Sequence, residues 1–405
     1  MNGACLECVK CGRDFSLNVI NTRCPDCNEP LEVRYDLDSI PGDWFESLKK
    51  GCSFERYAPF YSYLKTDPAL SLGEGQTSLI RSNRVNEKIG LKDLFFKNET
   101  QNPTWTFKDR GTAFSVQNAA SLGYRRLGTL SSGNMGASVA AFGSRAHMDT
   151  IILLKSNVPG EKSDALTVYG AKALKVSGNY GDVYYKALEI GKHFDIYFSV
   201  SDDPMRIEGY KSLAFELYEQ MEYLPPDYVA VPVGSGGLCR GILKGFEELN
   251  EVGFIDKIPK FIGVQTQGCS PTVDAYEQGK DEIEHFEGAL TLDHVLENPY
   301  PPSGNQVIRK MRSSGGVLLK VSNKEILDAE LFLAEEGIFA QPAAATALAG
   351  VIRAQAKDLI PAESSVVTVV TGSGLKYPHV LKKFNLSSDS TSLNQLAQAL
   401  EALII

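Results

Sequence analysis

The clearest pattern in the sequence is an alternation of short apolar runs with segments of helical periodicity, which begins at about residue 70. The run Arg126–Ser131 precedes a helical pattern over Ala137–Arg145, and Tyr228–Val233 precedes another over Leu238–Leu249. Further short apolar runs occupy Thr150–Leu154, Lys260–Val264 and Ser365–Val370. Such alternation predicts an α/β fold in which open, mostly parallel sheets are flanked by helices. In sheets of this kind, ligands bind in the loops at the carboxyl ends of the strands.

The segments that flank this body have different patterns. Residues 41–70 are rich in aromatic residues and prolines, which favours a linker or a packing arm. The final segment, Leu393–Ile405, has apolar residues at helical spacing, namely Leu393, Leu396, Leu400 and Leu403. We expect this segment to form a helix that packs on the body or on a partner subunit.

Composition narrows the class of protein. A chain of 405 residues that is 43% hydrophobic can bury a large core and is expected to form two or three domains. A net charge of -9 without a basic tract argues against nucleic acid or an anionic membrane as a partner. No apolar run approaches the length needed to cross a bilayer, and the N-terminus has no signal-peptide pattern. We therefore expect a cytoplasmic protein, whose eight cysteines serve as metal ligands or free thiols.

Five of the eight cysteines fall within the first 27 residues and predict a zinc ribbon over residues 1–40. Four of them form two CxxC pairs separated by twelve residues: Cys8, Cys11, Cys24 and Cys27. Two such turns present four thiolates to a tetrahedral Zn²⁺, a structural site with no open position. The alternatives are free-thiol turns or a redox dithiol, which would normally place one pair at a helix start. Cys5 is left over, and we prefer Cys8 with Cys11 because Gly12 relaxes the turn that follows.

The main chemical signal is Lys108, within the stretch Asn102–Gly111. Asn102-Pro103 is a turn signal, and Thr106 or Asp109 can cap a helix that starts there. A lysine beside the ring of Phe107, near the positive end of a helix and against apolar surface, loses its proton readily. The neutral amine can attack an aldehyde. Taken alone, Lys108 is more simply a solvated charge, so its interpretation depends on the loops further along.

A glycine-rich loop follows the strand that ends at Val233 and opens a helix; its residues are Gly234, Ser235, Gly236, Gly237 and Leu238. Bare amides at a helix N-terminus bind phosphate. The loop lacks the Gly-Lys-Ser/Thr ending of a Walker motif, and Cys239 breaks the dinucleotide fingerprint. A single phosphate monoester fits best, and the alternative is a turn that only redirects the chain.

Two more loops follow strands. In Ser131–Gly136, Asn134 can donate to a ring substituent, while Ser132 and the backbone amides can hold a carboxylate; alternatively, Asn134 is an N-cap. In Thr371–Lys376, the hydroxyl of Thr371 can face a ring nitrogen, and the alternative is an exposed turn. Together with Lys108 and the glycine loop, these features predict pyridoxal phosphate (PLP) as the cofactor, held in a Lys108 aldimine.

Seven motifs in one order carry a resemblance to a known family: Leu72–Thr77, Asn102–Gly111, Ser131–Asn134, Arg206–Lys211, Ser314–Val317, Glu336–Phe339 and Val370–Lys376. From about residue 70 to 380 the chain resembles the threonine synthase family, within the tryptophan-synthase-like, fold type II group of PLP enzymes. Several microbial members of that group also begin with a zinc-ribbon-like segment. The resemblance implies a lyase of amino-acid biosynthesis that converts O-phosphohomoserine and water to threonine and phosphate. It also implies a homodimer.

The chain departs from the family pattern around the substrate, at Trp105, Met135, Gly234–Leu238, Ser373 and Tyr377. Trp105 and Met135 would make the pocket narrower and more apolar. Each lost donor to a substrate phosphate costs on the order of 1 kcal/mol. The residues that remain to bind the substrate are Ser131, Ser132, Ser201 and Arg206.

These departures keep other functions open. One alternative is a related β-replacement enzyme, similar to a cysteate synthase, or a serine/threonine dehydratase. An alternative of a different class is a non-catalytic zinc-ribbon binding protein. For the domains we expect the zinc ribbon over 1–40, a large PLP-binding domain over 41–114 and 211–405, and a small domain over 115–210.

Overall fold

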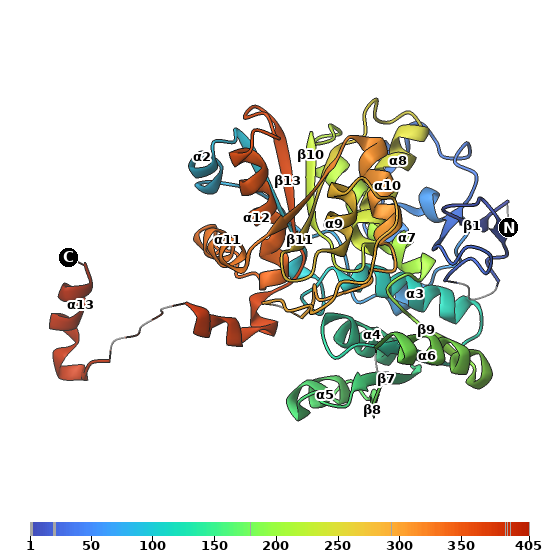
Figure 1. Ribbon diagram of the computed structural model, residues 1–405, viewed down its shortest axis with the longest axis horizontal. Coiled ribbons are helices and arrows are strands. Elements are labelled where there is room, and N and C mark those ends of the chain that lie inside the picture. Colours follow the sequence, from blue (N-terminus) through green and yellow to red (C-terminus); the bar gives the residue numbers. More distant parts are fainter. Residues whose placement is uncertain are drawn as a thin grey trace.

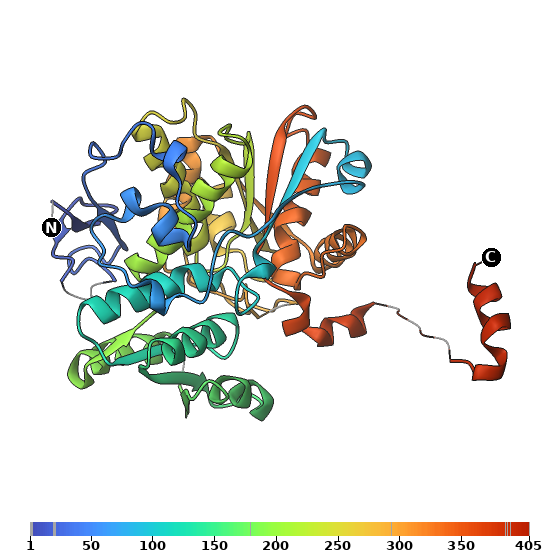
Figure 2. The same ribbon diagram turned by 180° about the vertical axis from the view of Figure 1, so that it is seen from behind.

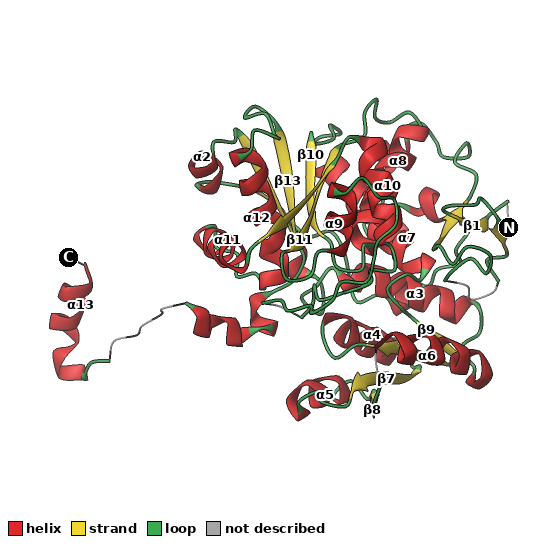
Figure 3. Cartoon of the chain, in the orientation of Figure 1, coloured by secondary structure: helices red, strands yellow, loops and turns green. Residues whose placement is uncertain are grey.

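A computed structural model describes residues 3–18, 22–178, 180–292, 294–384, 386, 388 and 390–404 (Figure 1). The predicted α/β class is confirmed, because two sheets with helices on their faces form the body and a small antiparallel sheet lies at the N-terminus. Figure 3 shows the strands of the larger sheet between two layers of helices. No described helix is both long enough and apolar enough to cross a membrane.

The larger sheet has six strands in the order β12-β11-β10-β13-β5-β4. Its neighbours are parallel except β4, which pairs with β5 in the antiparallel sense and makes the sheet mixed. Buried runs such as Val-Ala-Val and Val-Val form the central strands, as expected where both faces are covered. The strands are β4 (Leu79–Arg81), β5 (Asp93–Asn98), β10 (Tyr228–Pro232), β11 (Lys260–Thr266), β12 (Val317–Val321) and β13 (Ser365–Val370).

Two sets of helices cover this sheet, one on each face. Alternate strand residues divide between two separate apolar clusters. One cluster includes α7 (Pro204–Gln220), α8 (Gly237–Glu251), α9 (Pro271–Glu277) and α10 (Gly304–Ser314). The other includes α2 (Val85–Ile89), α11 (Asn323–Glu335) and α12 (Pro342–Ala356).

The smaller sheet has four parallel strands in the order β8-β7-β6-β9. Figure 2 shows it beside the larger sheet, with α3 (Lys108–Ser121) running between them. Helices α3, α4 and α5 pack in one apolar cluster with this sheet, and α6 packs in another. The elements are β6 (Arg126–Leu130), α4 (Asn134–Arg145), β7 (Asp149–Lys155), α5 (Gly160–Thr167), β8 (Lys172–Val176), α6 (Tyr180–Phe194) and β9 (Ile196–Phe198).

Glycines let α3, α7 and α8 approach one another closely. A Cβ at Gly111 would lie 2.7 Å from Cε1 of Tyr210, and one at Gly241 would lie 2.5 Å from Cβ of Tyr210. Gly209 and Gly245 are equally confined by neighbouring backbone. Because a side chain at any of these positions would push the helices apart, the glycines fix the starts of α3 and α8 relative to α7.

The N-terminal segment forms a three-stranded antiparallel sheet of β1 (Cys5–Cys8), β2 (Asp14–Phe15) and β3 (Leu31–Arg34). The segment 41–70 that follows contains η1 (Trp44–Ser47), α1 (Ser53–Arg56), η2 (Ala58–Tyr61) and η3 (Pro68–Leu70). Its rings are buried against α7; those of Phe60 and Phe215 lie 4.2 Å apart between centroids. The packing arm is therefore confirmed.

The C-terminal segment contains η5 (Gly374–Lys376), η6 (Pro378–Lys383), η7 (Leu393–Gln395) and α13 (Leu396–Ile404). The predicted helix is present, but α13 lies apart from the body in both views (Figures 1 and 2). The side chains of Leu396 and Leu403 are 44% and 69% exposed, so of the two expected packing surfaces the body of the same subunit is not used, and packing on a partner subunit stays a prediction. Ile405 lies outside the described residues.

Candidate active site

Lys108 is the first residue of α3, as the turn signal before it predicts. The chain before it is fixed by Thr371, whose carbonyl accepts hydrogen bonds from Phe107 N at 3.0 Å and Thr106 Oγ1 at 3.2 Å. Thr106 Oγ1 also accepts from Lys108 N at 3.4 Å, so it satisfies one amide at the helix start. Asp109 does not cap the helix; its carboxylate accepts from the amide and hydroxyl of Thr104, each at 2.6 Å.

The amine of Lys108 is placed for nucleophilic chemistry. Burial lowers its pKa to about 7, and the nearby charge of Arg206 contributes to the same shift. The amine lies 4.4 Å from the centroid of the Phe107 ring, and among the described residues it has no hydrogen-bond acceptor. The residue keeps some exposed surface, so a ligand can reach it. At neutral pH much of this lysine is the free amine that attacks an aldehyde.

Tyr210 of α7 connects Lys108 to the glycine loop. Its ring centroid lies 5.1 Å from that of Phe107, and its hydroxyl accepts a hydrogen bond from Arg206 at 2.6 Å. On its other side, Cε2 of Tyr210 lies 3.8 Å from where a Cβ of Gly237 would be. The structure therefore places both Phe107, the neighbour of the predicted lysine, and Gly237 of the predicted phosphate loop next to one ring.

The glycine loop has the features of an anion-binding site. Gly236 has a φ of +87° and precedes α8, which begins at Gly237. Within the described chain, the backbone amides of residues 234–238 donate to no protein acceptor. Free amides at the N-terminus of a fifteen-residue helix suit a phosphate group. The loop is braced from outside, where Ser303 N donates to Ser235 O at 3.1 Å and Asn298 Nδ2 to Ser235 Oγ at 3.1 Å.

The two remaining loops lie beside each other. Asn134 Nδ2 donates to Gln341 Oε1 at 3.1 Å, and Gln341 N donates to Gly372 O at 3.0 Å. Asn134 is the first helical residue of α4, and the N-cap is Gly133, so the alternative interpretation of Asn134 as an N-cap is wrong. Thr371 is buried, not part of an exposed turn. Gln341, which joins these two loops, was not among the predicted residues; its only sequence signal is its place before Pro342 at a helix start.

Three of the four predicted substrate residues are half-buried serines, and the fourth, Arg206, is fully buried. Ser131 and Ser132 are half-buried at the start of α4, and Ser131 Oγ accepts from Gly133 N at 3.2 Å. Ser201 is also half-buried, and its carbonyl lies 3.1 Å from where a Cβ of Gly237 would be. All four predicted substrate residues are thus near the starts of α4, α7 and α8.

Arg206 is buried more deeply than an arginine that binds phosphate at the protein surface. It is fully buried; its terminal nitrogens donate to Thr112 Oγ1 at 2.9 Å, Ser199 Oγ at 3.2 Å and Tyr210. Within the described residues it forms no ion pair, although its charge acts on the buried carboxyl of Asp203, and its Nε has no hydrogen-bond partner. A buried guanidinium with no ion-pair partner and an unpaired Nε favours an anionic ligand nearby.

The metal-ligand candidates come together at the N-terminus. One ligand atom from each of Cys8, Cys11, Cys24 and Cys27 lies within 4.8 Å of all the others. Four thiol sulfurs at this separation suit a tetrahedral Zn²⁺. Cys5 is not in the cluster, and its thiol donates to Asp14 Oδ1 at 3.6 Å. The cluster is therefore the one that the two CxxC pairs predict.

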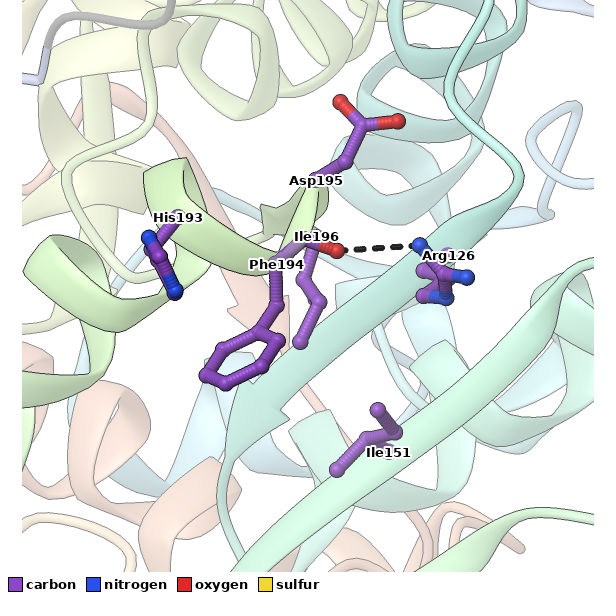
Figure 4. Close-up of a pocket in the computed structure, with 6 residues that line it drawn as sticks. All are labelled: Arg126, Ile151, His193, Phe194, Asp195 and Ile196. Carbon is purple, nitrogen blue, oxygen red and sulfur yellow. Dashed lines mark hydrogen bonds between the residues drawn. The ribbon is translucent and has the colours of Figure 1, made fainter.

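A separate cavity lies at the other end of the small sheet (Figure 4). It has a volume of about 520 Å³ and is lined by Arg126, Ile151, His193, Phe194, Asp195 and Ile196. These residues are near the amino ends of β6 and β9, whereas the loop 131–136 follows the carboxyl end of β6. The cavity therefore does not belong to the site around Lys108.

The fold and this site define a class: an enzyme dependent on pyridoxal phosphate, of the fold type II architecture. The family model for "Pyridoxal-phosphate dependent enzyme" matches residues 70–372. Among solved structures, the chain is similar to a fungal L-serine ammonia-lyase from Rhizomucor miehei, with a TM-score of 0.66 and 21% identity over 77% of this chain and 99% of that one. It is also similar to threonine deaminase isoform 2 from Solanum lycopersicum, with a TM-score of 0.65 and 21% identity over 76% of this chain and 88% of that one. At such identities the likeness concerns the fold alone.

Sequence comparison gives the particular family. The chain is 35% identical to the threonine synthase of Methanocaldococcus jannaschii over 92% of this chain and 93% of that protein. It is 34% identical to the threonine synthase of Methanosarcina acetivorans over 93% of each chain. The chain belongs to the threonine synthase family of pyridoxal-phosphate-dependent enzymes. The alternative of a non-catalytic binding protein is therefore set aside.

Proposed function

We propose that this chain converts O-phosphohomoserine and water to threonine and phosphate. The observation that carries the proposal is the amine of Lys108, which has no hydrogen-bond partner among the described residues, beside the buried Arg206, a guanidinium that forms no ion pair and whose Nε is unpaired. The amine suits the aldehyde of the cofactor, and the guanidinium suits a phosphorylated amino acid. The names of the relatives at 35% and 34% identity support the same reaction.

We assign the site residues as follows. Lys108 binds the cofactor aldehyde against Phe107, Asn134 pairs with the ring hydroxyl, and Thr371 faces the ring nitrogen. The amides of Gly234, Ser235, Gly236, Gly237 and Leu238 hold the cofactor phosphate. The substrate is held by Ser131, Ser132, Ser201 and Arg206, and a structural Zn²⁺ by Cys8, Cys11, Cys24 and Cys27.

The chemistry divides between cofactor and protein. When bound, pyridoxal phosphate supplies an electron sink for charge that develops at the substrate Cα. Lys108 removes the Cα proton and later returns it, and the lowered pKa keeps its amine neutral enough to act as a base. The hydroxyl of Thr371, unlike a carboxylate, would not hold a ring nitrogen protonated. Arg206 attracts the phosphate of the substrate, which is also the leaving group.

A second candidate is a related replacement enzyme, similar to a cysteate synthase, or a serine/threonine dehydratase. The observation that favours it is the apolar character of two positions at which the chain departs from the family pattern, Trp105 and Met135. Met135 is buried at the start of α4, and Trp105, with a φ of +60°, lies three residues before the lysine. Such residues leave fewer polar donors for a substrate phosphate than the family pattern provides.

A substrate comparison tests the proposal. The purified enzyme with pyridoxal phosphate is incubated with O-phosphohomoserine, and released phosphate and threonine are measured. Parallel reactions with O-phosphoserine plus sulfite, serine and threonine are assayed for cysteate, ammonia and keto acid. Phosphate and threonine in equal amounts support the proposal, whereas keto acid from serine or threonine, or cysteate, supports the second candidate. Lys108→Ala must abolish the Schiff-base absorbance band in either case.

Three further assignments remain proposals. The domain limits 1–40, 41–114 with 211–405, and 115–210 are supported by the separation of the three sheets in the sequence. A homodimer is supported by the exposed apolar side of α13. A cytoplasmic location is supported by eight free cysteines, four of them clustered as thiols that a reducing compartment preserves.

A further inference from the structure

The N-terminal ribbon, residues 3–18 and 22–34, is joined to the catalytic body by charged contacts. Glu32 accepts from Arg240 of α8 at 3.1 Å and from Gln306 of α10 at 2.9 Å. Glu29 accepts from Arg309 of α10 at 2.6 Å. These contacts attach the ribbon to α8, which begins at the glycine loop, and to α10 beside it.

One contact differs from the others because it begins at the cysteine cluster itself. Arg23 directly precedes Cys24, and its Nε donates to the carbonyl of Asn28 at 2.8 Å and to its Oδ1 at 3.1 Å. The amide of Asn28 donates in turn to Cys24 O at 2.9 Å. The guanidinium is therefore held by the turn that presents Cys24 and Cys27.

The other side of the same guanidinium contacts two segments of the body. One terminal nitrogen donates to Asp202 Oδ2 at 2.8 Å and to Pro302 O at 3.1 Å. Asp202 is fully buried, and Arg23 is the cation with which it forms an ion pair in the described structure. Its second carboxylate oxygen accepts from the hydroxyl of Tyr184 in α6.

Both contacted segments border the candidate active site. Asp202 follows Ser201 and precedes Asp203, the N-cap of α7, whose first turn carries Arg206. Pro302 precedes Ser303, whose amide donates to Ser235 of the glycine loop. Arg23 thus connects the cysteine cluster both to the segment 199–206 and to the segment Pro302–Ser303, which contacts the glycine loop.

We infer that Arg23 is a positioning residue through which the metal site of the ribbon holds the segment 199–206 in its substrate-binding conformation. The inference rests on the proposed function, because Ser201 and Arg206 are assigned there to the substrate. Metal on the four sulfurs fixes the Cys24–Asn28 turn, the turn fixes Arg23, and Arg23 fixes the buried carboxylate of Asp202. Without metal, the turn and the segment 199–206 lose this connection.

Steady-state kinetics of the holoenzyme test this role. Arg23→Ala is expected to raise KM for O-phosphohomoserine at least tenfold while kcat changes less than twofold, since the contacts it positions hold the substrate equally in the bound and transition states. Arg23→Lys keeps a cation and is expected to recover part of the loss. Arg34→Ala is the matched control, because Arg34 pairs with Glu7 inside the ribbon but outside the Cys24–Asn28 turn and is 58% exposed. Wild-type KM in Arg23→Ala overturns the inference.

Hydrogen exchange supplies a readout that does not need turnover. Amides of residues 199–206 are expected to exchange at least fivefold faster after the metal is removed, and equally fast in metal-loaded Arg23→Ala. Metal and cofactor contents, measured on each sample, confirm that Arg23→Ala retains both. Unchanged exchange in these samples overturns the inference. If exchange changes as expected while O-phosphohomoserine is not turned over, the coupling is supported and the proposed substrate is rejected.

Discussion

At the scale of single residues, the environment of Lys108 determines the pH at which the site can react. Burial lowers the pKa of the amine to about 7 from an ordinary 10.5, and the charge of Arg206 acts in the same direction. A lysine with a lowered pKa is the neutral nucleophile above that pH and the inert ammonium below it. The site should therefore accept an aldehyde near neutral pH, where exposed lysines remain charged.

The rate of cofactor uptake tests this property. In protein freed of pyridoxal phosphate, the rate of incorporation at Lys108 is expected to rise with pH to a plateau, with a midpoint near 7. Stopped-flow absorbance of the Schiff base gives the rate, and Lys108→Ala provides the blank. A midpoint above 9 would show that the lysine is solvated and its burial unimportant.

Gly236 is the residue whose backbone conformation the glycine loop needs. Its φ of +87° disfavours side chains, and a Cβ would lie 2.9 Å from Cβ of Ser303. Gly236→Ala is expected to lower the free energy of unfolding by about 2 kcal/mol or more and to weaken cofactor binding at least tenfold. Gly253→Ala is the matched control, because Gly253 has a φ of +79° but open space around it. Equal effects of the two substitutions on cofactor affinity would contradict the steric argument.

The sequence indicated the local conformation of single residues where a motif specifies it, but not their contacts where the fold determines them. Lys108 and Gly236 belong to motifs whose geometry follows from a turn or a helix start. Gln341 could not be predicted, because its contact with Asn134 joins positions 207 residues apart. The depth of Arg206 also depends on tertiary packing, since Thr112, Ser199 and Tyr210 enclose it from different elements.

At the scale of elements, the strands after which the loops follow were predictable because buried parallel strands are continuous apolar runs. The runs at 126–131, 228–233 and 365–370 correspond to β6, β10 and β13 within one residue. Strand β4 was not predicted, because three residues, two half-buried and one exposed, carry no distinct pattern. Helix α13 was predicted as an element, but its apolar spacing did not specify what it packs against.

Helices α3 and α7 are held together by buried charges as well as by their glycines. Arg110 donates to Glu99 at 2.6 Å and to Glu216 at 2.6 Å, and Lys97 also donates to Glu216 at 2.7 Å. Burial alone would raise the pKa of Glu216, but the charges of Arg110 and Lys97 hold it well below its ordinary 4.5. The helix that carries Lys108 is thus anchored two residues after that lysine.

Because these ion pairs need Glu216 to be ionised, the free energy of unfolding should fall at acid pH. A carboxyl with a lowered folded pKa contributes its full stabilisation above about pH 4.5 and loses it as the pH falls toward the folded value. Glu216→Gln is expected to cost about 3 kcal/mol at pH 7, and the difference from wild type should shrink below pH 4.5. Denaturant unfolding between pH 7 and 3 measures both. Glu363→Gln removes an exposed ion pair with Lys92 and should change stability by less than about 0.5 kcal/mol at any of these pH values.

At the scale of the whole molecule, the ribbon and the packing arm form one continuous core with the larger sheet. Buried residues of the ribbon, such as Leu31 and Val33, belong to the same apolar cluster as Phe215 and Val229. Lys211 of α7 lies within 4.7 Å of the ring centroids of Tyr35 and Tyr61 and forms ion pairs with Glu208 and Glu248. The N-terminal segment is therefore built into the enzyme rather than attached by a tether.

Helix α13, unlike the ribbon, does not pack on the body. Its removal should therefore change subunit assembly without changing the stability of the subunit. Deleting residues 393–405 is expected to leave the melting temperature of the subunit within about 2 °C of wild type, because the apolar side chains of this segment are exposed. If α13 supplies the subunit contact of the proposed homodimer, the truncated chain sediments as a monomer. Leu396→Glu with Leu400→Glu should reproduce this result in the full-length chain, whereas Gln395→Glu with Gln398→Glu, on the polar side, should not. A truncated chain that still sediments as a dimer would place the subunit contact elsewhere on the body.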